Sequence, residues 1–246
     1  MDKVLIVTGA SRGIGAAIAA LAARDGWAVG VNYLHDAAAA AAVVAGIEAH
    51  GGRALAVQGD VASAADIERL FASVEQALGP VTGLVNNAGI TGPLGSFSAS
   101  DPAMVEAVFR TNVLGLMQCS RRALAAFRAH GRGGVIVNSS STAATVGSPH
   151  EFAVYAASKG AVDTFTMGLG KEVAGEGIRV CGVAPGTTQT GIHAAAGDPG
   201  RPARAAGRIP MQRVGEPEEV AEAVRWLLSP AASYVTGSTL RVSGGA

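Results

Sequence analysis

Lysine, cysteine and aromatic residues are scarce in this chain. Only three of its 19 basic residues are lysines, only two residues are cysteines, and aromatic residues make up 4% of the 246 positions. The cysteines, Cys119 and Cys181, form no CxxC pair, so we expect buried thiols rather than a disulfide framework or a metal site. No apolar run near the start is long enough for a signal peptide or a membrane span, and a cytoplasmic protein is the simplest expectation.

The chain also has no excess of charge of either sign. Its formal net charge is zero, and charged residues make up only 15% of it. It therefore offers no basic face for nucleic acid and no acidic tail, and we expect neither a nucleic-acid nor a membrane partner. With 246 residues, 49% of them hydrophobic, it is long enough for one substantial core. We predict a single domain over residues 1–246.

Short Val/Ile/Leu runs alternate with Ala-rich stretches along the whole chain. We expect strands at 3–8, 27–32, 53–58, 82–86, 134–138, 178–183 and 238–242. We expect helices at 14–24, 37–49, 64–78, 102–127, 152–173 and 218–228, the fourth with an inner break near Gly115. Because the strands are continuous apolar runs separated by helices, both faces of the sheet should be covered. The predicted fold is α/β: a doubly wound parallel sheet of about seven strands in a three-layer α/β/α sandwich.

One long irregular region interrupts this alternation, at residues 187–215. It is rich in Gly, Pro, Arg and Ala and shows no clear helical or strand period. A stretch of that length inside a compact domain is usually functional, and often a lid over a binding site. The alternative is an ordinary surface loop. We expect a substrate lid here.

The first expected strand runs directly into a glycine-rich turn, TGASRGIG, at residues 8–15. Glycines allow the backbone to approach a pyrophosphate, and the start of a helix supplies free N–H groups and the positive end of its dipole. The position between the first strand and the first helix distinguishes this segment from an ordinary turn. We expect it to bind a dinucleotide through Gly9, Ser11, Arg12, Gly13, Ile14 and Gly15.

The end of the second expected strand bears on the choice between the two nicotinamide cofactors. It reads Val31-Asn32-Tyr33 and contains no acid. An Asp or Glu there would accept from the ribose 2′-OH and repel a 2′-phosphate. Its absence, together with Arg12 in the glycine-rich turn, favours NADP(H), with Asn32 and Tyr33 as further cofactor contacts. NAD(H) is the alternative if Arg12 is only a solvated cation and Asn32 tolerates either cofactor.

Polar residues also follow the third and fourth expected strands. Asp60 and Val61 would suit an adenine, although the same segment would serve as a helix cap. Asn87, Ala88 and Gly89 would form an ordinary turn equally well. Ligands of parallel sheets bind at the carboxyl ends of the strands, and all of these residues lie at such ends. We therefore count them as cofactor-binding candidates.

Tyr155 and Lys159, in VYAASKG, are four residues apart on an expected helix and so share a face. A free tyrosine has a pKa of about 10, and a nearby ammonium or a cationic nicotinamide ring would favour its phenolate. Lysine can also pass on a proton, whereas arginine stays charged. A chain that otherwise prefers arginine therefore has a reason to place lysine here. We expect a proton-transfer pair rather than a solvated surface pair.

Hydroxyl and amide groups provide partners for this pair. Ser139, Ser140 and Ser141 end the fifth expected strand, and one of them would hydrogen-bond a substrate oxygen. Chemistry alone does not rank the three serines. Asn112 lies in an otherwise apolar helical segment. It is either a satisfied core amide or a group that orders a water chain behind Lys159.

Taken together, TGASRGIG, NNAG, TNV, the serine cluster, YAASK and APG resemble the short-chain dehydrogenase/reductase family, in that family's order and over the whole chain. The resemblance implies a Rossmann-type domain, hydride transfer between a nicotinamide and a carbonyl or alcohol, and a homotetramer. It makes Tyr155 the general acid/base, Lys159 its partner, Ser141 the donor to the substrate oxygen and Asn112 part of the proton relay. It places Asn87 and Gly89 at the adenosine side, and Pro185, Gly186 and Thr188 beside the nicotinamide.

Two positions depart from the family's usual pattern. Cys181 stands where an Asn is common, and Ser243 stands where an Asp is common, at a place that touches subunit contacts. The insert 148–152 and the segment 197–208 are expected to shape the substrate site, with His150 and His193 either loop residues or substrate contacts. A 3-oxoacyl thioester and a sugar or polyol both remain open as substrates. The alternative from another class is a regulator that binds NADP(H) without turnover.

Overall fold

A computed structural model describes residues 3–246 of the chain. Its strands are β1 (Lys3–Val7), β2 (Trp27–Tyr33), β3 (Ala54–Gln58), β4 (Gly83–Asn86), β5 (Gly134–Ser139), β6 (Ile178–Pro185) and β7 (Thr239–Val242). They form one sheet in the order β3-β2-β1-β4-β5-β6-β7. Every neighbouring pair is parallel. The predicted α/β fold with seven parallel strands is confirmed.

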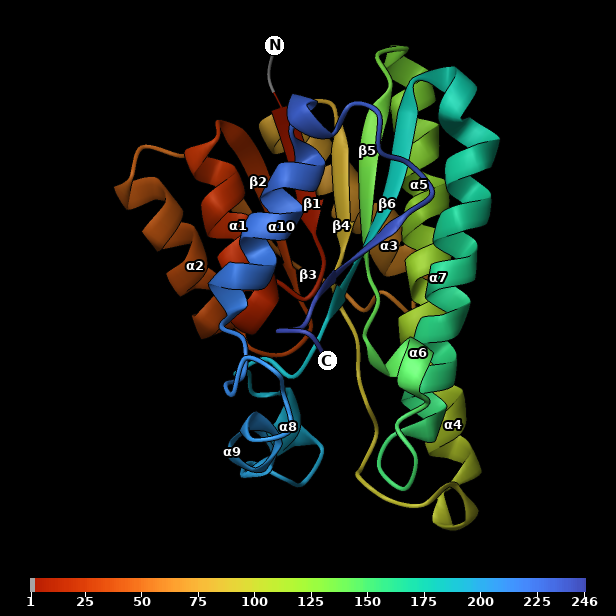
Figure 1. The fold of residues 1–246 in the computed structure, drawn as a ribbon. Helices are drawn as coiled ribbons and strands as arrows, with labels where there is room; N and C mark the ends of the chain where they lie inside the picture. The colour runs from red at the N-terminus through yellow and green to blue at the C-terminus, as the bar shows by residue number, and fades with distance from the viewer. Residues whose placement is uncertain (1–2) are drawn as a thin grey trace.

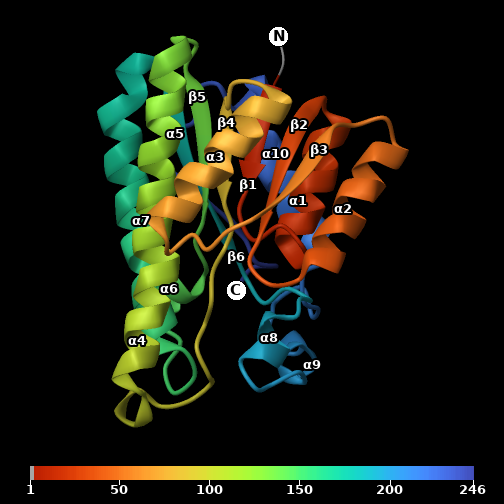
Figure 2. The ribbon, with the colours of Figure 1, turned by 180° about the vertical axis from the view of Figure 1, so that it is seen from behind.

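Helices cover both faces of the sheet (Figures 1 and 2). One layer contains α1 (Gly13–Arg24), α2 (Ala37–Ala49) and α10 (Pro217–Leu228), and the other contains α3 (Ala64–Leu78), α5 (Leu116–His130) and α7 (Ala153–Val173). Strand β1 shows how the two cores form: Val4 and Ile6 pack into one, and Leu5 and Val7 into the other. All four side chains are fully buried, as a two-faced apolar strand requires.

The strand order reverses between β1 and β4, which are neighbours although β2 and β3 come between them in the chain. Connections leave these two strands toward opposite sides, and a doubly wound sheet binds its ligand at such a point. Four short helices lie beyond the carboxyl ends of the strands (Figure 1). They are α4 (Pro102–Phe109), α6 (Ala143–Val146), α8 (Ile192–Ala195) and α9 (Arg201–Ala206). The long loops are thus gathered where the motif residues lie.

The helix expected at 102–127 is interrupted. Helix α4 ends at Phe109, a π-helical turn spans Arg110–Gly115, and α5 begins at Leu116. A Cβ atom at Gly115 would lie 2.7 Å from the Val61 carbonyl oxygen, so the turn packs closely on the segment after β3. Single π-helical turns are frequent at functional sites, and this one contains Asn112.

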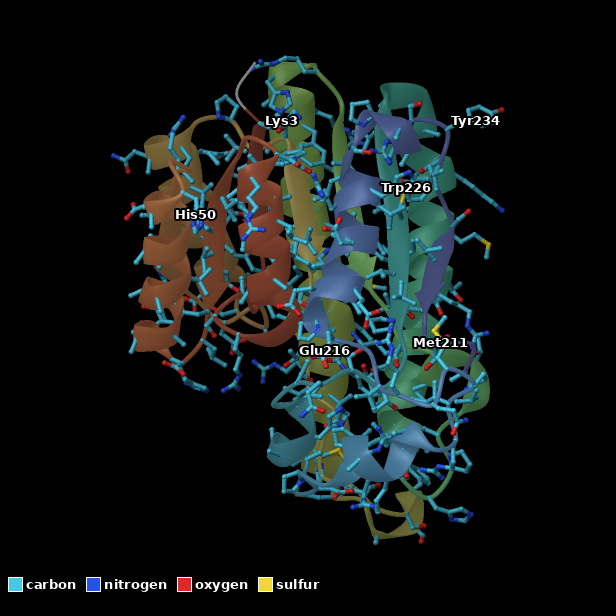
Figure 3. The ribbon with its side chains drawn as sticks, turned by 60° about the vertical axis from the view of Figure 1, so that its left-hand side comes forward. Lys3, His50, Met211, Glu216, Trp226 and Tyr234 are labelled. Atoms are coloured by element: carbon cyan, nitrogen blue, oxygen red, sulfur yellow. The ribbon has the colours of Figure 1, made fainter. Side chains whose placement is uncertain are left out.

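The segment 187–215 contains the two short helices α8 and α9. Near its C-terminal end, the Met211 N–H donates to the Gly244 carbonyl at 3.1 Å, so this segment lies against the C-terminal residues of the chain. Met211 is labelled in Figure 3. Short 3₁₀ turns occur at Phe97–Ala99, Ala174–Glu176 and Pro230–Ala232. None of the helices found between residues 3 and 246 has both the length and the apolar character needed to cross a bilayer.

Candidate active site

The glycine-rich turn joins β1 to α1 and presents bare backbone. Gly9 and Gly13 have φ angles of 61° and 56°, a region that side chains with a Cβ rarely adopt. A Cβ atom at Gly15 would lie 2.5 Å from both the Asn87 side-chain nitrogen and the Gly9 carbonyl oxygen. The turn therefore requires glycine at all three positions. Bare backbone at the start of a helix, with Ser11 among its residues, fits a pyrophosphate.

Two amides hold this turn from behind. Asn32 is buried, accepts from the Gly9 N–H at 3.3 Å and donates to two carbonyls at the end of β3 at 3.0 and 3.4 Å. Asn87 donates to the carbonyls of Thr8 and Gly9, both at 3.0 Å. Sequence reasoning placed both residues at the cofactor. Their amide groups bind the backbone and fix the shape of the turn, and contact of either residue with the cofactor stays a prediction.

The end of β2 carries no carboxylate that is free to meet a ribose. The nearest acid, Asp36, caps α2 by accepting from the Ala39 N–H at 2.9 Å. Tyr33 ends β2 and is partly buried. Arg12 is exposed at the N-cap of α1, and its side chain makes no capping hydrogen bond. This geometry leaves the Arg12 cation at the start of α1, with no free carboxylate on the end of β2 itself.

The ends of β3 and β4 lie beside the turn. Asp60 accepts from the Ala62 N–H at 2.8 Å, and the neighbouring Val61 is buried. The Ala88 N–H donates to the Thr8 hydroxyl at 3.0 Å. The next residue, Gly89, touches the proton-transfer groups. A Cβ atom there would lie 3.2 Å from the Asn112 side-chain oxygen, which is a tight contact, and 3.5 Å from the Lys159 ammonium, which is an ordinary van der Waals contact.

Tyr155 and Lys159 lie on α7, beside the end of β5. Lys159 is 3% exposed, and its Nζ atom donates to the Ser139 carbonyl at 2.6 Å. The same atom lies 5.6 Å from the centroid of the Tyr155 ring. The Ser141 side chain lies close enough to the Tyr155 phenol to lower its pKa. The structure thus brings Ser141, Tyr155 and Lys159 together, with Ser140 turned to the Lys159 carbonyl instead.

Burial dominates the electrostatics of this group. Burial raises the pKa of Tyr155, while the Ser141 side chain and the charge of Arg201 act in the opposite direction. It lowers the pKa of Lys159 to about 8, and Asp163 opposes that shift. We expected the lysine to lower the pKa of the phenol, but removing a phenolate from water costs more than the surrounding charges return. The protein alone therefore keeps Tyr155 protonated at neutral pH.

Asn112 is fully buried in the π-helical turn, and its amide is fully hydrogen-bonded. It donates to the Ile90 carbonyl at 2.8 Å and the Ser158 hydroxyl at 3.0 Å, and it accepts from the Ile90 N–H at 2.9 Å. These bonds tie α7 to the segment after β4, next to Lys159. A part in a proton relay stays a prediction for this residue.

The segment after β6 closes another side of the site. The Pro185 carbonyl accepts from the Thr142 N–H at 3.0 Å, which joins this strand end to the serine cluster. Gly186 packs against Ser243, whose Cα would lie 2.9 Å from a Cβ atom at this glycine. Thr188 is buried just beyond. Pro185, Gly186 and Thr188, the three predicted nicotinamide contacts, are therefore held in place together along one side of the site.

The two histidines of the loops differ in their surroundings. His193 is buried on α8 and donates from its ring to the Thr188 carbonyl at 2.9 Å. Burial lowers its pKa. His150 is exposed and has a φ angle of 62°. The His193 hydrogen bond therefore links α8 to the start of the segment 187–215.

A buried polar network, which sequence reasoning missed, supports the site from below. Asn86 of β4 donates to the Asn138 side chain of β5 at 2.9 Å and to the Ser120 hydroxyl of α5 at 3.0 Å. Asn138 donates in turn to the Thr166 hydroxyl of α7 at 2.9 Å. The network fixes two strand ends relative to the helix that carries Tyr155.

Sequence reasoning also missed Arg201, at the start of α9. Its guanidinium donates to one carboxylate oxygen of Glu151 at 2.7 and 3.2 Å. It also lies 5.2 Å from the centroid of the Phe152 ring. The Phe152 ring meets Tyr155 edge-on, with 6.4 Å between centroids. Two features of the sequence pointed indirectly to this contact: the arginines of the segment 187–215 and the insert 148–152 before Tyr155.

Comparison with known proteins agrees with this site. A family model described as enoyl-(acyl carrier protein) reductase matches residues 9–246. The uncharacterized oxidoreductase YgfF of Escherichia coli (strain K12) is 46% identical over 98% of this chain and 99% of its own length. The 3beta-hydroxysteroid dehydrogenase 1 of Eggerthella lenta is 42% identical over 99% of this chain and 93% of its own. A 3-oxoacyl-[acyl-carrier-protein] reductase of Synechocystis sp. is 40% identical over 99% and 96%.

Replacing Lys159 with methionine should stabilise the fold at neutral pH. Burial lowers the pKa of Lys159 from 10.5 to about 8, so the folded protein bears the full cost of the buried ammonium below that value. Above it the folded chain binds fewer protons than the unfolded chain, and stability rises with pH until about 10.5. We expect Lys159→Met to gain roughly 1–3 kcal/mol at about pH 7, and much less at about pH 10.

Urea unfolding at the two pH values measures this difference. Lys171→Met is the matched control, because Lys171 is exposed on the same helix. A stabilisation of equal size at both pH values would contradict the expected cost of the buried ammonium.

Proposed function

This chain belongs to the short-chain dehydrogenase/reductase family of oxidoreductases, whose members act on CH–OH or C=O groups with a nicotinamide cofactor, and we propose that it uses NADP(H) to interconvert a carbonyl and an alcohol. The observation that carries the proposal is the meeting of Ser141, Tyr155 and Lys159 at the carboxyl end of β5, beside the glycine-rich turn.

The roles of these residues follow from their contacts. NADP(H), when bound, supplies or accepts the hydride. Tyr155 gives its proton to the carbonyl oxygen during reduction and takes it back from the alcohol during oxidation. Ser141 donates a hydrogen bond to the same oxygen. Lys159 holds a positive charge beside the phenol, and Asn112 fixes the segment against which that lysine packs.

The cofactor would lie along the carboxyl ends of the strands. The turn from Gly9 to Gly15, with Ser11, Gly13 and Ile14, would hold the pyrophosphate. Asp60, Val61, Ala88 and Gly89 would flank the adenosine, and Pro185, Gly186 and Thr188 the nicotinamide. Arg12 is the group we assign to the 2′-phosphate, because it is a cation exposed at the start of α1 where the neighbouring strand end offers no free acid.

The substrate we favour has an apolar body. The segments after β4 and β5 carry exposed apolar side chains: Ile90, Leu94 and Phe97 on the first, and Val146 on the second. Such side chains suit an acyl chain better than a sugar or polyol. Two relatives bear names that refer to a steroid and a 3-oxoacyl substrate. Of the two substrate classes open from the sequence, these observations favour the 3-oxoacyl thioester.

The proposal treats residues 1–246 as one cytoplasmic domain with a lid at 187–215. The single continuous sheet supports one domain. Both cysteines are free and buried, as is typical of a reducing compartment. A hydrogen bond from the Gln189 N–H to the Gly215 carbonyl joins the two ends of the lid, and one from the Met211 N–H to the Gly244 carbonyl ties it to the C-terminal segment. Helices α8 and α9 lie between Gln189 and Met211.

We also propose a homotetramer, because two separate faces expose large apolar side chains. Trp226 on α10 and Leu240 on β7 are 42% and 39% exposed, and Trp226 lies on the outer surface in Figure 3. Leu114 and Met167 are 51% and 49% exposed on the other helical layer. We expect sedimentation equilibrium to give about four times the chain mass of 24.4 kDa. A species of one chain mass would overturn this part of the proposal.

Cofactor choice is tested by fluorescence titration with NADPH and, separately, NADH. We expect NADPH to bind at least about tenfold more tightly, because a charged hydrogen bond to the 2′-phosphate contributes about 1.5–3 kcal/mol. Arg12→Gln should lose most of this advantage and leave NADH binding unchanged. Arg24→Gln, an exposed cation at the other end of α1, is the control. Tighter NADH binding by the parent protein would refute the assignment of Arg12.

Catalysis is tested with a 3-oxoacyl thioester and NADPH, by following the loss of NADPH absorbance. We expect turnover by the parent protein and a loss of about 10²–10⁴-fold in Tyr155→Phe, because the phenol is the proton donor. The same variant should still bind NADPH in the titration above. NADPH binding without turnover of any carbonyl or alcohol tested would favour the non-catalytic regulator instead.

A further inference from the structure

Segments that follow three neighbouring strands meet near the start of α7. The Leu94 N–H, after β4, donates to the Ala196 carbonyl of the lid at 3.1 Å. The next residue, Gly95, donates its N–H to the Glu151 carbonyl, before α7, at 3.0 Å. The lid is therefore hydrogen-bonded to one loop, which is hydrogen-bonded to the next.

Arg201 joins the lid directly to the third of these segments. Its side chain is 17% exposed and forms the 2.7 Å ion pair with Glu151. Its guanidinium lies over the Phe152 ring, and the Phe152 and Tyr155 rings meet in a T-shaped pair. Phe152 therefore lies between a residue of the segment 187–215 and Tyr155.

Among the charged groups around Tyr155, Arg201 is the lid cation that acts on the phenol. The charged or titratable groups near the phenol are Lys159 and Asp163 on α7, Glu151 before α7, and His193, Asp198 and Arg201 on the lid. His193 stays neutral at pH 7 because burial lowers its pKa. The charge of Lys159 fades above about pH 8, whereas a guanidinium keeps its charge throughout. Arg201 is the lid cation that lowers the pKa of Tyr155.

We propose that Arg201 is a positioning residue for Tyr155, which brings a permanent positive charge to the phenol when the lid rests on the Glu151–Phe152 loop. The inference rests on the proposed function, because it concerns the acidity of the group assigned to proton transfer. Glu151 holds the guanidinium in place, and Phe152 sets its distance from the phenol.

This arrangement links lid position to proton transfer. With the lid seated, the charge of Arg201 favours the phenolate; with the lid lifted, that charge leaves and the phenol becomes a weaker acid. The coupling is reciprocal, so ionisation of Tyr155 must favour the seated lid by the same free energy. A simple mechanical latch would use the same ion pair with no effect on the phenol.

The pH profile of kcat/KM separates these two roles. We expect the limb set by Tyr155 to move upward by about 0.5–1 pH unit in Arg201→Gln, and to stay near the parent value in Arg201→Lys. Arg204→Gln is the matched control, because Arg204 lies on the same short helix but pairs with Asp198 and is 62% exposed. It should leave the profile unchanged.

A second measurement needs neither substrate nor cofactor. The chain has three tyrosines, so the phenolate absorbance of Tyr155 is obtained by subtracting the alkaline titration of the matching Tyr155→Phe variant. Arg201→Gln should raise this transition by the same amount as in the kinetic profile. Glu151→Gln removes the anion that partly offsets the guanidinium, and it should lower the transition. Circular dichroism confirms that each variant is folded.

The outcomes are distinct. If Arg201→Gln and Glu151→Gln both reduce kcat/KM and neither titration moves, Arg201 is only a latch and the proposal is overturned. If Arg201→Gln does not fold, a downward shift in Glu151→Gln supports the charge role, and an absent or upward shift overturns it. A shifted phenolate transition in a protein without turnover would support the role of Arg201 and refute the proposed function instead.

Discussion

A buried ammonium has to be hydrogen-bonded, and Lys159 meets this constraint through the Ser139 carbonyl at 2.6 Å. That bond sets the distance between α7 and the end of β5. It places Tyr155, one helical turn earlier, beside Ser141. It also brings the ammonium close to Gly89, where a Cβ atom would make ordinary van der Waals contact with it at 3.5 Å. The geometry of the proton-transfer group follows from the need to satisfy this one charge.

Amide side chains provide the rigidity that the glycines cannot. The turn after β1 needs glycine for its φ angles and its close contacts, and glycine has no side chain to pack. Asn32 and Asn87 supply the missing bonds from the neighbouring strands. Asn86 and Asn138 do the same beneath β4 and β5, and each of these amides joins elements far apart in the chain. The polar groups at the carboxyl ends of the strands therefore hold the structure together, in addition to any part they take in catalysis.

Charge is distributed unevenly between the fixed part of the site and the lid. On the fixed part, burial raises the pKa of Tyr155 and lowers that of Lys159, and both shifts favour the neutral forms. Arg201, on the lid, opposes this tendency at the phenol. The Tyr155 phenol is hard to ionise in the fixed part of the site alone, and it becomes easier to ionise when Arg201 is seated beside it. That is an economical way to confine proton transfer to the closed state.

The sequence by itself determined the α/β fold, because continuous apolar strands between helices permit few other arrangements, and the family, because its motifs stand in the family's order. It also singled out Tyr155 and Lys159, since spacing on a helix is a local property. Only the tertiary structure decided that Asn32 and Asn87 bind backbone, that a π-helical turn holds Asn112, and that Arg201 reaches Tyr155. These contacts join residues distant in the chain, and the pattern around any one of them does not name its partner.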